Sequence, residues 1–202
     1  KAVISHTGAL IGGDDVFEAA LARAGAVRAR TIEQLFAAAQ ILSSGYRLEG
    51  NRLAVLSNGG GPAILAADRA AELGVALPEL GESTTHRLQA LLPPSSALLN
   101  PLDLGADAEA ERFAKGLEAV LEDPSVDGAL ALVAPRACTN ATEIAEAVLT
   151  TAQGSRKPLL ACWMGDGQMQ GAREVLAGTK VPQFQAPEAA VEAFYYLAQY
   201  RR

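Results

Sequence analysis

RLAVLSNGGGP, residues 52–62, is a short apolar run followed by a polar pair, three consecutive glycines and a proline. A continuous apolar run of this length is typical of a strand that is buried on both faces of a parallel sheet. The glycines suit a tight turn, and Pro62 suits the first turn of a helix, where no N–H is needed. The stretch therefore predicts a strand–turn–helix unit, the building block of α/β proteins.

Similar units follow along the rest of the chain, in which short apolar runs alternate with helical patterns. The predicted strands are Arg52–Ser57, Val75–Leu77, Gly128–Val133, Pro158–Trp163 and Pro182–Phe184. The predicted helices cover residues 62–73, 84–92, 107–122, 141–152, 168–177 and 187–200. This order predicts an α/β fold with a doubly wound parallel five-stranded sheet, and we expect the flavodoxin-like strand order 2-1-3-4-5.

Residues that favour helix ends stand at suitable places in this pattern. Gly74 and Gly178 follow predicted helices, where a left-handed residue is common. Asn140 or Thr142 can cap the helix at 141–152, and Pro187 suits the first turn of the last helix. These signals predict a complete domain over residues 47–202.

Residues 1–46 hold too few elements for a complete domain. Asp14 or Asp15 can cap a first helix, and Ala26-Val27-Arg28 is long enough only for a small strand. The first helix has an apolar face made of Val16, Phe17, Ala20, Leu21 and Ala24, with Gly25 at the expected C′ position. We interpret this part as the C-terminal end of another domain, and the chain, which has no initiating Met, as cut from a longer polypeptide.

A second helix is also predicted before residue 46. Thr31 and Gln34 form a capping-box pattern at its start. Its spacing predicts a buried stripe made of Leu35, Phe36, Ala39 and Leu42. Residues 43–46 then form a candidate linker to the second domain.

The chain has 202 residues, with 17 Lys and Arg against 23 Asp and Glu, so its formal net charge is −6. Half the residues are hydrophobic and a fifth are charged, which is the balance of a globular protein and not of a disordered chain. The acidic balance argues against a nucleic-acid partner. No apolar run reaches the roughly 20 residues that span a bilayer, and no secretory signal is visible, so we expect no membrane partner.

The two cysteines, Cys138 and Cys162, are far apart and form no C-x-x-C pair. Together with the two histidines they lack the spacing of a zinc site, so no metal site is predicted. We expect both cysteines to behave as small apolar residues in a reducing compartment, which predicts a cytoplasmic protein.

Doubly wound sheets bind ligands beyond the carboxyl ends of their strands, where the strand order reverses. Here that point lies between the first and third strands, at the turn that begins with Asn58. The N–H groups of Gly59, Gly60 and Gly61 and the dipole of the following helix can hold a phosphate; the alternative is a tight turn without a ligand. The turn is not a Walker A loop, because no Gly-Lys-Ser/Thr follows, and it does not complete a dinucleotide fingerprint.

His6 lies ahead of the first helix in a loop of small residues, Ser5-His6-Thr7-Gly8-Ala9-Leu10. A neutral imidazole titrates near neutrality and can attack phosphorus, so His6 is a candidate nucleophile or general base. A surface residue without a chemical role is the alternative. His86, the other histidine, lies in the first turn of a predicted helix and is interpreted as solvated surface.

The loop from Pro93 to Gly105 is the longest segment without a predicted element, and it can reach the same crevice. It contains Asn100 and Asp103. Asp103 either orients a substrate or is a turn residue. Arg136, which follows the third strand, either meets an anion at the mouth of the sheet or is an exposed loop arginine.

Taken together, these motifs resemble the NDP-forming acyl-CoA synthetases, relatives of succinyl-CoA synthetase, some of which are fused to a GNAT acetyltransferase. The stretch 5–10 (SHTGAL) resembles the family's phosphohistidine loop. The stretch 57–62 (SNGGGP) resembles the glycine turn that opens a phosphate-facing helix in its second flavodoxin-like domain. The stretches 100–104 (NPLDL) and 157–163 (KPLLACW) are also similar, and residues 193–202 resemble the acetyltransferase-fused members.

The resemblance implies a succinyl-CoA synthetase-like fold, with the His loop at the end of one flavodoxin-like domain and a complete CoA-ligase domain at 47–202. It implies a reversible reaction in which a small acid, CoA and ATP become acyl-CoA, ADP and phosphate through an acyl phosphate. His6 would carry the phosphoryl group. Asn58 and the N–H groups of the three glycines would stabilise it, and Asn100 and Asp103 would belong to a substrate loop.

The resemblance also implies what this chain does not hold. CoA, ATP and Mg belong to the full-length protein, whose CoA-binding and ATP-grasp domains would be the partners of this chain. The fragment alone is predicted to be inactive. Apolar surface on residues 1–46 would be exposed without those domains, so a homodimer is a further expectation.

Two other interpretations remain open. In acetyltransferase-fused relatives the synthetase-like region can be catalytically silent and sense acyl-CoA or CoA, as the regulatory region of a protein lysine acetyltransferase. The intact His6 favours catalysis, since a sensing domain needs no nucleophile. A receiver-like fold is disfavoured, because the third strand ends in Ala134-Pro135 and not in a phosphorylatable Asp.

Overall fold

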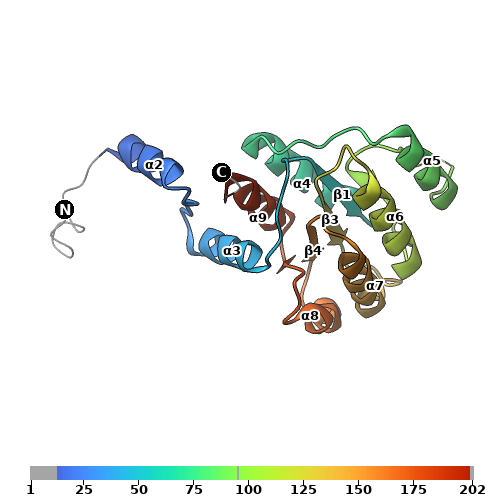
Figure 1. The fold of residues 1–202 in the computed structure, drawn as a ribbon. Helices are drawn as coiled ribbons and strands as arrows, with labels where there is room; N and C mark the ends of the chain where they lie inside the picture. The colour runs from blue at the N-terminus through green and yellow to red at the C-terminus, as the bar shows by residue number, and fades with distance from the viewer. Residues whose placement is uncertain (1–12, 95, 201–202) are drawn as a thin grey trace.

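The centre of the molecule is a five-stranded parallel sheet, seen in a computed structural model that describes residues 13–94 and 96–200 (Figure 1). The strand order is β2-β1-β3-β4-β5, and every neighbouring pair is parallel. The strands are β1 (Leu53–Ser57), β2 (Leu102–Asp103), β3 (Gly128–Val133), β4 (Leu159–Trp163) and β5 (Gln183–Phe184). The predicted doubly wound α/β fold and its strand order are confirmed.

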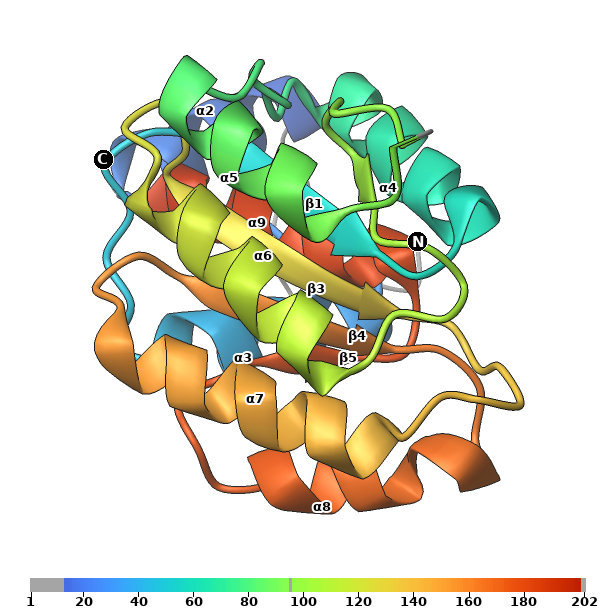
Figure 2. The same cartoon turned by 90° about the vertical axis from the view of Figure 1, so that its right-hand side faces the viewer.

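Helices cover both faces of the sheet (Figure 2). One face carries α5 (Glu82–Leu91), α6 (Ala110–Glu122), α7 (Ala141–Gly154) and α8 (Gln170–Leu176), the last preceded by a 3₁₀ turn at Gly167–Met169. The other face carries α3 (Ile32–Ser43), α4 (Gly60–Leu73) and α9 (Pro187–Tyr200). Figure 1 shows α2 (Asp14–Arg23) at the outer end of the molecule, beyond α3.

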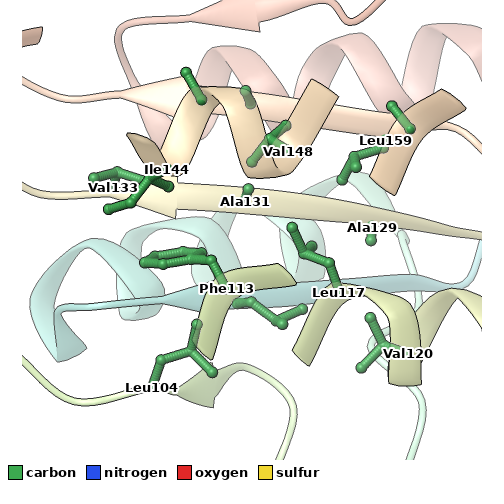
Figure 3. Close-up of a cluster of buried hydrophobic side chains, with 14 of the residues drawn as sticks. Leu104, Phe113, Leu117, Val120, Ala129, Ala131, Val133, Ile144, Val148 and Leu159 are labelled. Atoms are coloured by element: carbon green, nitrogen blue, oxygen red, sulfur yellow. The ribbon is translucent and has the colours of Figure 1, made fainter. Parts of the chain in front are cut away.

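The central strand β3 shows why the apolar runs are continuous. Its alternate side chains enter two different cores, because successive residues of a strand point to opposite faces. Ala129, Ala131 and Val133 belong to the core under α6 and α7, whereas Leu130 and Leu132 belong to the core under α4 and α9. Figure 3 shows the first core, in which Phe113, Leu117 and Val120 lie opposite the β3 alanines.

The helix-end signals read from the sequence have the expected geometry. Gly74 and Gly178 have φ of +68° and +72°, the left-handed conformation that favours glycine. The Asn140 side chain accepts a hydrogen bond from the N–H of Glu143 at the start of α7. Thr31 caps α3 in the same way, by accepting from the N–H of Gln34.

The second strand of the sheet was predicted in the wrong place. Val75–Leu77 forms only a single bridge, between Ala76 and Arg52. The second strand is β2, inside the segment from Pro93 to Gly105, where no element is predicted. β2 pairs with the last two residues of β1, while Asn100 bonds to the middle of the strand. Two segments, one at Ala76 and one at residues 100–103, therefore share one edge of β1. A two-residue strand leaves no periodic pattern to detect.

The predicted buried face of α3 is wrong. Leu35 and Phe36 are 58% and 69% exposed, whereas the buried residues are Ala37, Ala38 and Ile41, which belong to the same core as α9. Both faces of α3 are apolar, so the pattern did not distinguish them. The face that carries the small residues Ala37 and Ala38 lets α3 approach α9 closely, and this is the face that packs against the core.

The first helix also differs from its prediction. α2 has no buried residue, and Val16 and Phe17 on its apolar face are 66% and 55% exposed. Its N-cap is Gly13, which makes no side-chain bond, so neither predicted aspartate caps the helix. Asp14 instead pairs with Arg28, which belongs to an irregular segment and not to the small strand that we expected.

The cysteines differ from each other. Cys162 is buried in β4, and burial raises the pKa of its thiol to about 12, as expected for an apolar core residue. Cys138 is exposed in the loop after β3, so the prediction of an apolar environment is wrong for it. Both cysteines are free thiols.

Candidate functional site

The strand order reverses between β1 and β3. β1 leads into α4 on one face of the sheet, and β3 leads into α7 on the opposite face. The two connections separate at the carboxyl edge and leave a place there that neither helix covers, which is where ligands of doubly wound sheets bind. The residues at this place are Asn58 and the glycines after β1, and Ala134 to Arg136 after β3.

Asn58 is fully buried and joins the two connections. Its Oδ1 accepts a hydrogen bond from the N–H of Ala134 at 2.7 Å, and its Nδ2 donates to the carbonyl of Ala134 at 3.0 Å. Nδ2 also lies 3.4 Å from Oγ1 of Thr139. The amide therefore holds the glycine turn against the end of β3, and its donors are engaged within the protein.

Gly59 is likewise part of the framework. Its N–H donates to Oγ of Ser57 at 3.1 Å, and that hydroxyl donates to the Gly59 carbonyl at 2.9 Å. This hydroxyl closes the turn on itself, a role that the sequence analysis did not assign to Ser57.

Gly60 and Gly61 are the open donors of the turn. They are the first two residues of α4, whose N-cap makes no side-chain hydrogen bond, and both are exposed. The first N–H groups of a helix have no partner within the helix, and the helix dipole adds positive potential to them. A Cβ on Gly61 would meet nothing within 4 Å, so no other residue packs closely against Gly61 on that side.

Arg136 brings a cation to the same place. Its Nη2 lies 3.3 Å from the position that a Cβ on Gly59 would occupy. Its carbonyl accepts hydrogen bonds from the Thr139 N–H at 3.1 Å and from Nε2 of Gln168 at 2.7 Å, so its backbone is held from two directions. Sequence reasoning missed Thr139 and Gln168; both follow strands at the carboxyl edge, a position that could have drawn attention to them.

The two residues of the predicted substrate loop have different surroundings. Asn100 accepts from the Val55 N–H at 3.0 Å and donates to the Leu53 carbonyl at 2.9 Å, so its side chain extends the ladder of β1. Asp103 is exposed, and its Oδ2 lies 4.0 Å from the Cβ position of Gly60. Of this pair, only Asp103 lies beside the glycine turn.

Of the two histidines, His6 lies outside the residues that the structure describes. His86 is exposed on α5, in agreement with its interpretation as solvated surface.

Within the described ranges, no group of three His, Cys, Asp or Glu side chains is arranged to hold a metal ion. Two cavities of about 620 and 650 Å³ lie beside the C-terminal half of α9 and the segment that leads into β1, not at the glycine turn. None of the helices over 13–94 and 96–200 is long and apolar enough to cross a membrane.

Comparison with known proteins gives a consistent result. The model of the succinyl-CoA ligase like flavodoxin domain matches residues 1–42. The chain is 36% identical, over all 202 residues, to acetate–CoA ligase [ADP-forming] I of Archaeoglobus fulgidus. It is 34% identical, over 98% of its length, to the α subunit of acetate–CoA ligase [ADP-forming] II of Pyrococcus furiosus.

This chain is a homologue of the ADP-forming acetate–CoA ligases. The fold agrees: the solved acetyl-coenzyme A synthetase 1 of Ca. Korarchaeum cryptofilum, in complex with phosphate and ADP, superposes with a TM-score of 0.92 at 29% identity. That match covers 98% of this chain and 43% of the solved chain. This chain spans 28% of the length of the Archaeoglobus relative and 44% of the length of the Pyrococcus subunit, so it corresponds to only a part of each.

Proposed function

We propose that this chain forms part of an ADP-forming acyl-CoA synthetase and provides one side of a phosphohistidine site. The observation that carries the proposal is the open N-terminus of α4, with Gly60 and Gly61 exposed at the reversal point of the sheet. Homology to acetate–CoA ligases supports an acid as the substrate. We further propose a small acyl acid.

In the proposed reaction His6 is the phosphoryl carrier. A ring nitrogen of His6 forms a bond to the γ-phosphorus of ATP, and ADP leaves with the electron pair of the broken P–O bond. An oxygen of the acid then takes the phosphoryl group, which frees the imidazole and gives an acyl phosphate. The CoA sulfur attacks the acyl carbon, phosphate leaves, and the thiol proton is taken up by the departing phosphate.

The role of this chain in that sequence is electrostatic. Charge is spread over the phosphoryl oxygens during each transfer, and fixed N–H donors stabilise it without rearranging. Gly60 and Gly61 would supply those donors directly. Asn58 and Gly59, which the resemblance placed among the direct ligands, would instead hold the turn in position, since their own donors are engaged.

The remaining components would come from the parent protein. We propose that its CoA-binding and ATP-grasp domains supply CoA, ATP and Mg, that residues 1–46 complete a domain contributed from elsewhere, and that the fragment alone is inactive. The exposed apolar faces of α2 and α3 support such a contact and also a homodimer. The free thiols of Cys138 and Cys162 support a cytoplasmic location.

The test is to incubate the full-length parent protein with Mg-ATP and to map phosphorylation by mass spectrometry. Phosphohistidine is recognised by its lability in acid and its stability in base. We expect the label on His6, its loss on addition of acid and CoA, and its absence in His6→Gln. His86→Gln is the matched control and should be labelled normally.

Failure to label a folded parent protein would refute the carrier role. If that protein still bound acyl-CoA, the result would favour the other candidate, a catalytically silent region that senses acyl-CoA or CoA within a lysine acetyltransferase.

A further inference from the structure

We propose that Arg136 is the side chain that binds the phosphoryl oxygens at the glycine turn and sets the affinity of the site for phosphate. The inference rests on the proposed function, because it assigns a new ligand to that same site. It gives the N-terminus of α4 a charged partner from a different strand connection.

The geometry brings Arg136 and the open N–H groups together. Nη2 of Arg136 lies 3.3 Å from the Cβ position of Gly59, and Gly60 and Gly61 are the next two residues. Consecutive Cα atoms are about 3.8 Å apart. The guanidinium therefore lies beside the turn that carries the two N–H groups, and we infer that one tetrahedral anion contacts both.

The guanidinium is also available for a ligand. Among the described residues, ion pairs engage seven arginines, at positions 28, 30, 52, 69, 87, 112 and 173, but not Arg136. Arg136 is exposed, while its backbone is fixed by Thr139 and Gln168. Because the backbone of Arg136 is already fixed, binding a ligand would cost only the conformational entropy of its side chain.

The chemistry favours a phosphoryl group as the ligand. Arginine presents a planar fork of donors that matches two oxygens of a phosphate, and such charge-assisted bonds are about twice as strong as neutral ones. The exposed carboxylate of Asp103 lies near the same N–H groups, and it would repel a dianion. The positive charge of Arg136 offsets that repulsion. The partial charges on the glycine N–H groups alone would offset less of it.

The position of Arg136 also explains why residue 59 is a glycine. Its φ of −156° is extended backbone that any residue adopts, so conformation does not require glycine there. A Cβ at this position would instead press on the Arg136 guanidinium, which would have to move by a few tenths of an ångström. The absence of a Cβ leaves room for the arginine to reach over the turn.

The test uses the intact synthetase in the direction that consumes acyl-CoA, ADP and inorganic phosphate. We expect Arg136→Ala to raise the KM for phosphate about tenfold or more, with the KM values for ADP and acyl-CoA nearly unchanged. Arg136→Lys should recover part of the loss, because it restores the charge but not the fork. Arg156→Ala, which removes another exposed arginine, is the matched control and should leave all three values unchanged.

An unchanged KM for phosphate in Arg136→Ala would overturn the inference, and so would an effect confined to the acid and acyl-CoA, which would make Arg136 a substrate carboxylate ligand. If the wild-type parent shows no synthetase activity, the proposed function fails separately. Calorimetric titration of the same proteins with inorganic phosphate then decides: weaker binding by Arg136→Ala supports the inference, and equal or absent binding in both proteins refutes it.

Discussion

The amino and carboxyl edges of the sheet differ in how completely their charged and polar groups are paired within the protein. At the amino edge, Asp127 accepts three hydrogen bonds from Arg52, from its N–H at 2.9 Å, Nε at 2.9 Å and Nη2 at 2.7 Å. Asp123 accepts from the N–H groups of Gly81 and Ser125, each at 2.8 Å. Lys157 donates to the Asp123 carbonyl at 2.6 Å, so charges at this edge are engaged within the protein.

The carboxyl edge uses the same kinds of groups but leaves two of them open, the start of α4 and Arg136. Asp123 receives the N–H of Gly81 at the start of α5, whereas no side chain caps the start of α4. Arg52 has a carboxylate partner, whereas Arg136 has none among the described residues. The difference separates two uses of polar groups: engaged ones stabilise the fold, and open ones are available to a ligand.

The largest effect is expected from Asp127→Ala. It removes a carboxylate that is 7% exposed and leaves the N–H of Arg52 without its acceptor, so the free energy of unfolding should fall by about 2–3 kcal/mol. Urea denaturation of the chain measures the change. Asp166→Ala removes a fully exposed carboxylate and should change stability by less than about 0.5 kcal/mol. Equal losses in both variants would show that the amino edge has no special role.

Asn58→Ala should have the next largest effect, because the amide joins β1 to β3 at the other edge. Loss of its buried bonds to Ala134 should lower the free energy of unfolding by about 1–3 kcal/mol, again by urea denaturation. A stability equal to that of the wild type would contradict the framework role and would return Asn58 to the set of direct phosphate ligands.

The contribution of Asp127, at the amino edge, to the free energy of unfolding should also depend on pH. The hydrogen bond from the Arg52 side chain lowers the pKa of Asp127 below the roughly 3.9 of an unfolded aspartate. The unfolded chain therefore binds more protons below about pH 5, and the contribution of Asp127 is present above that pH and lost as pH falls through the folded-state pKa. The stability difference between wild type and Asp127→Asn should thus shrink between pH 6 and pH 2. A difference that stays constant would contradict the assignment.

The smallest stability effects are expected in the glycine turn. Gly59→Ala and Gly61→Ala should each change the free energy of unfolding by less than about 0.5 kcal/mol, since Gly61 faces open space and the atom near Gly59 ends a flexible side chain. Their effects on phosphate should differ, because only Gly59→Ala displaces Arg136. In the intact synthetase, Gly59→Ala should raise the KM for phosphate more than Gly61→Ala does. The reverse order would argue against the position given to Arg136.

The sequence predicted the parts of the fold that repeat a pattern. The runs 128–133 and 158–163 show continuous hydrophobicity, and glycine at 74 and 178 signals a left-handed helix end; these features appear as expected. The second strand was missed because β2 has only two residues and Asn100 replaces part of its pairing with a side chain. Such pairing depends on tertiary contacts and leaves no local signal.

The sequence predicted where the candidate site lies, but not which of its polar groups are free to bind a ligand. The reversal of strand order located the turn at Asn58–Pro62, because that rule depends on topology alone. Whether a donor such as the Asn58 amide faces a ligand or the backbone depends on the distance to Ala134, which is 76 residues away in the chain. The sequence gives the type of each group, and only the fold tells which ones are engaged.

The most direct test of this contrast is an amide NMR titration of the 202-residue chain with inorganic phosphate. We predict that the N–H signals of Gly60 and Gly61 shift in a saturable way, while those of Gly59 and Gly81, which are bonded within the protein, shift far less. Equal shifts at all four glycines, or shifts at Gly81 alone, would contradict the claim that the N-terminus of α4 is the open anion site.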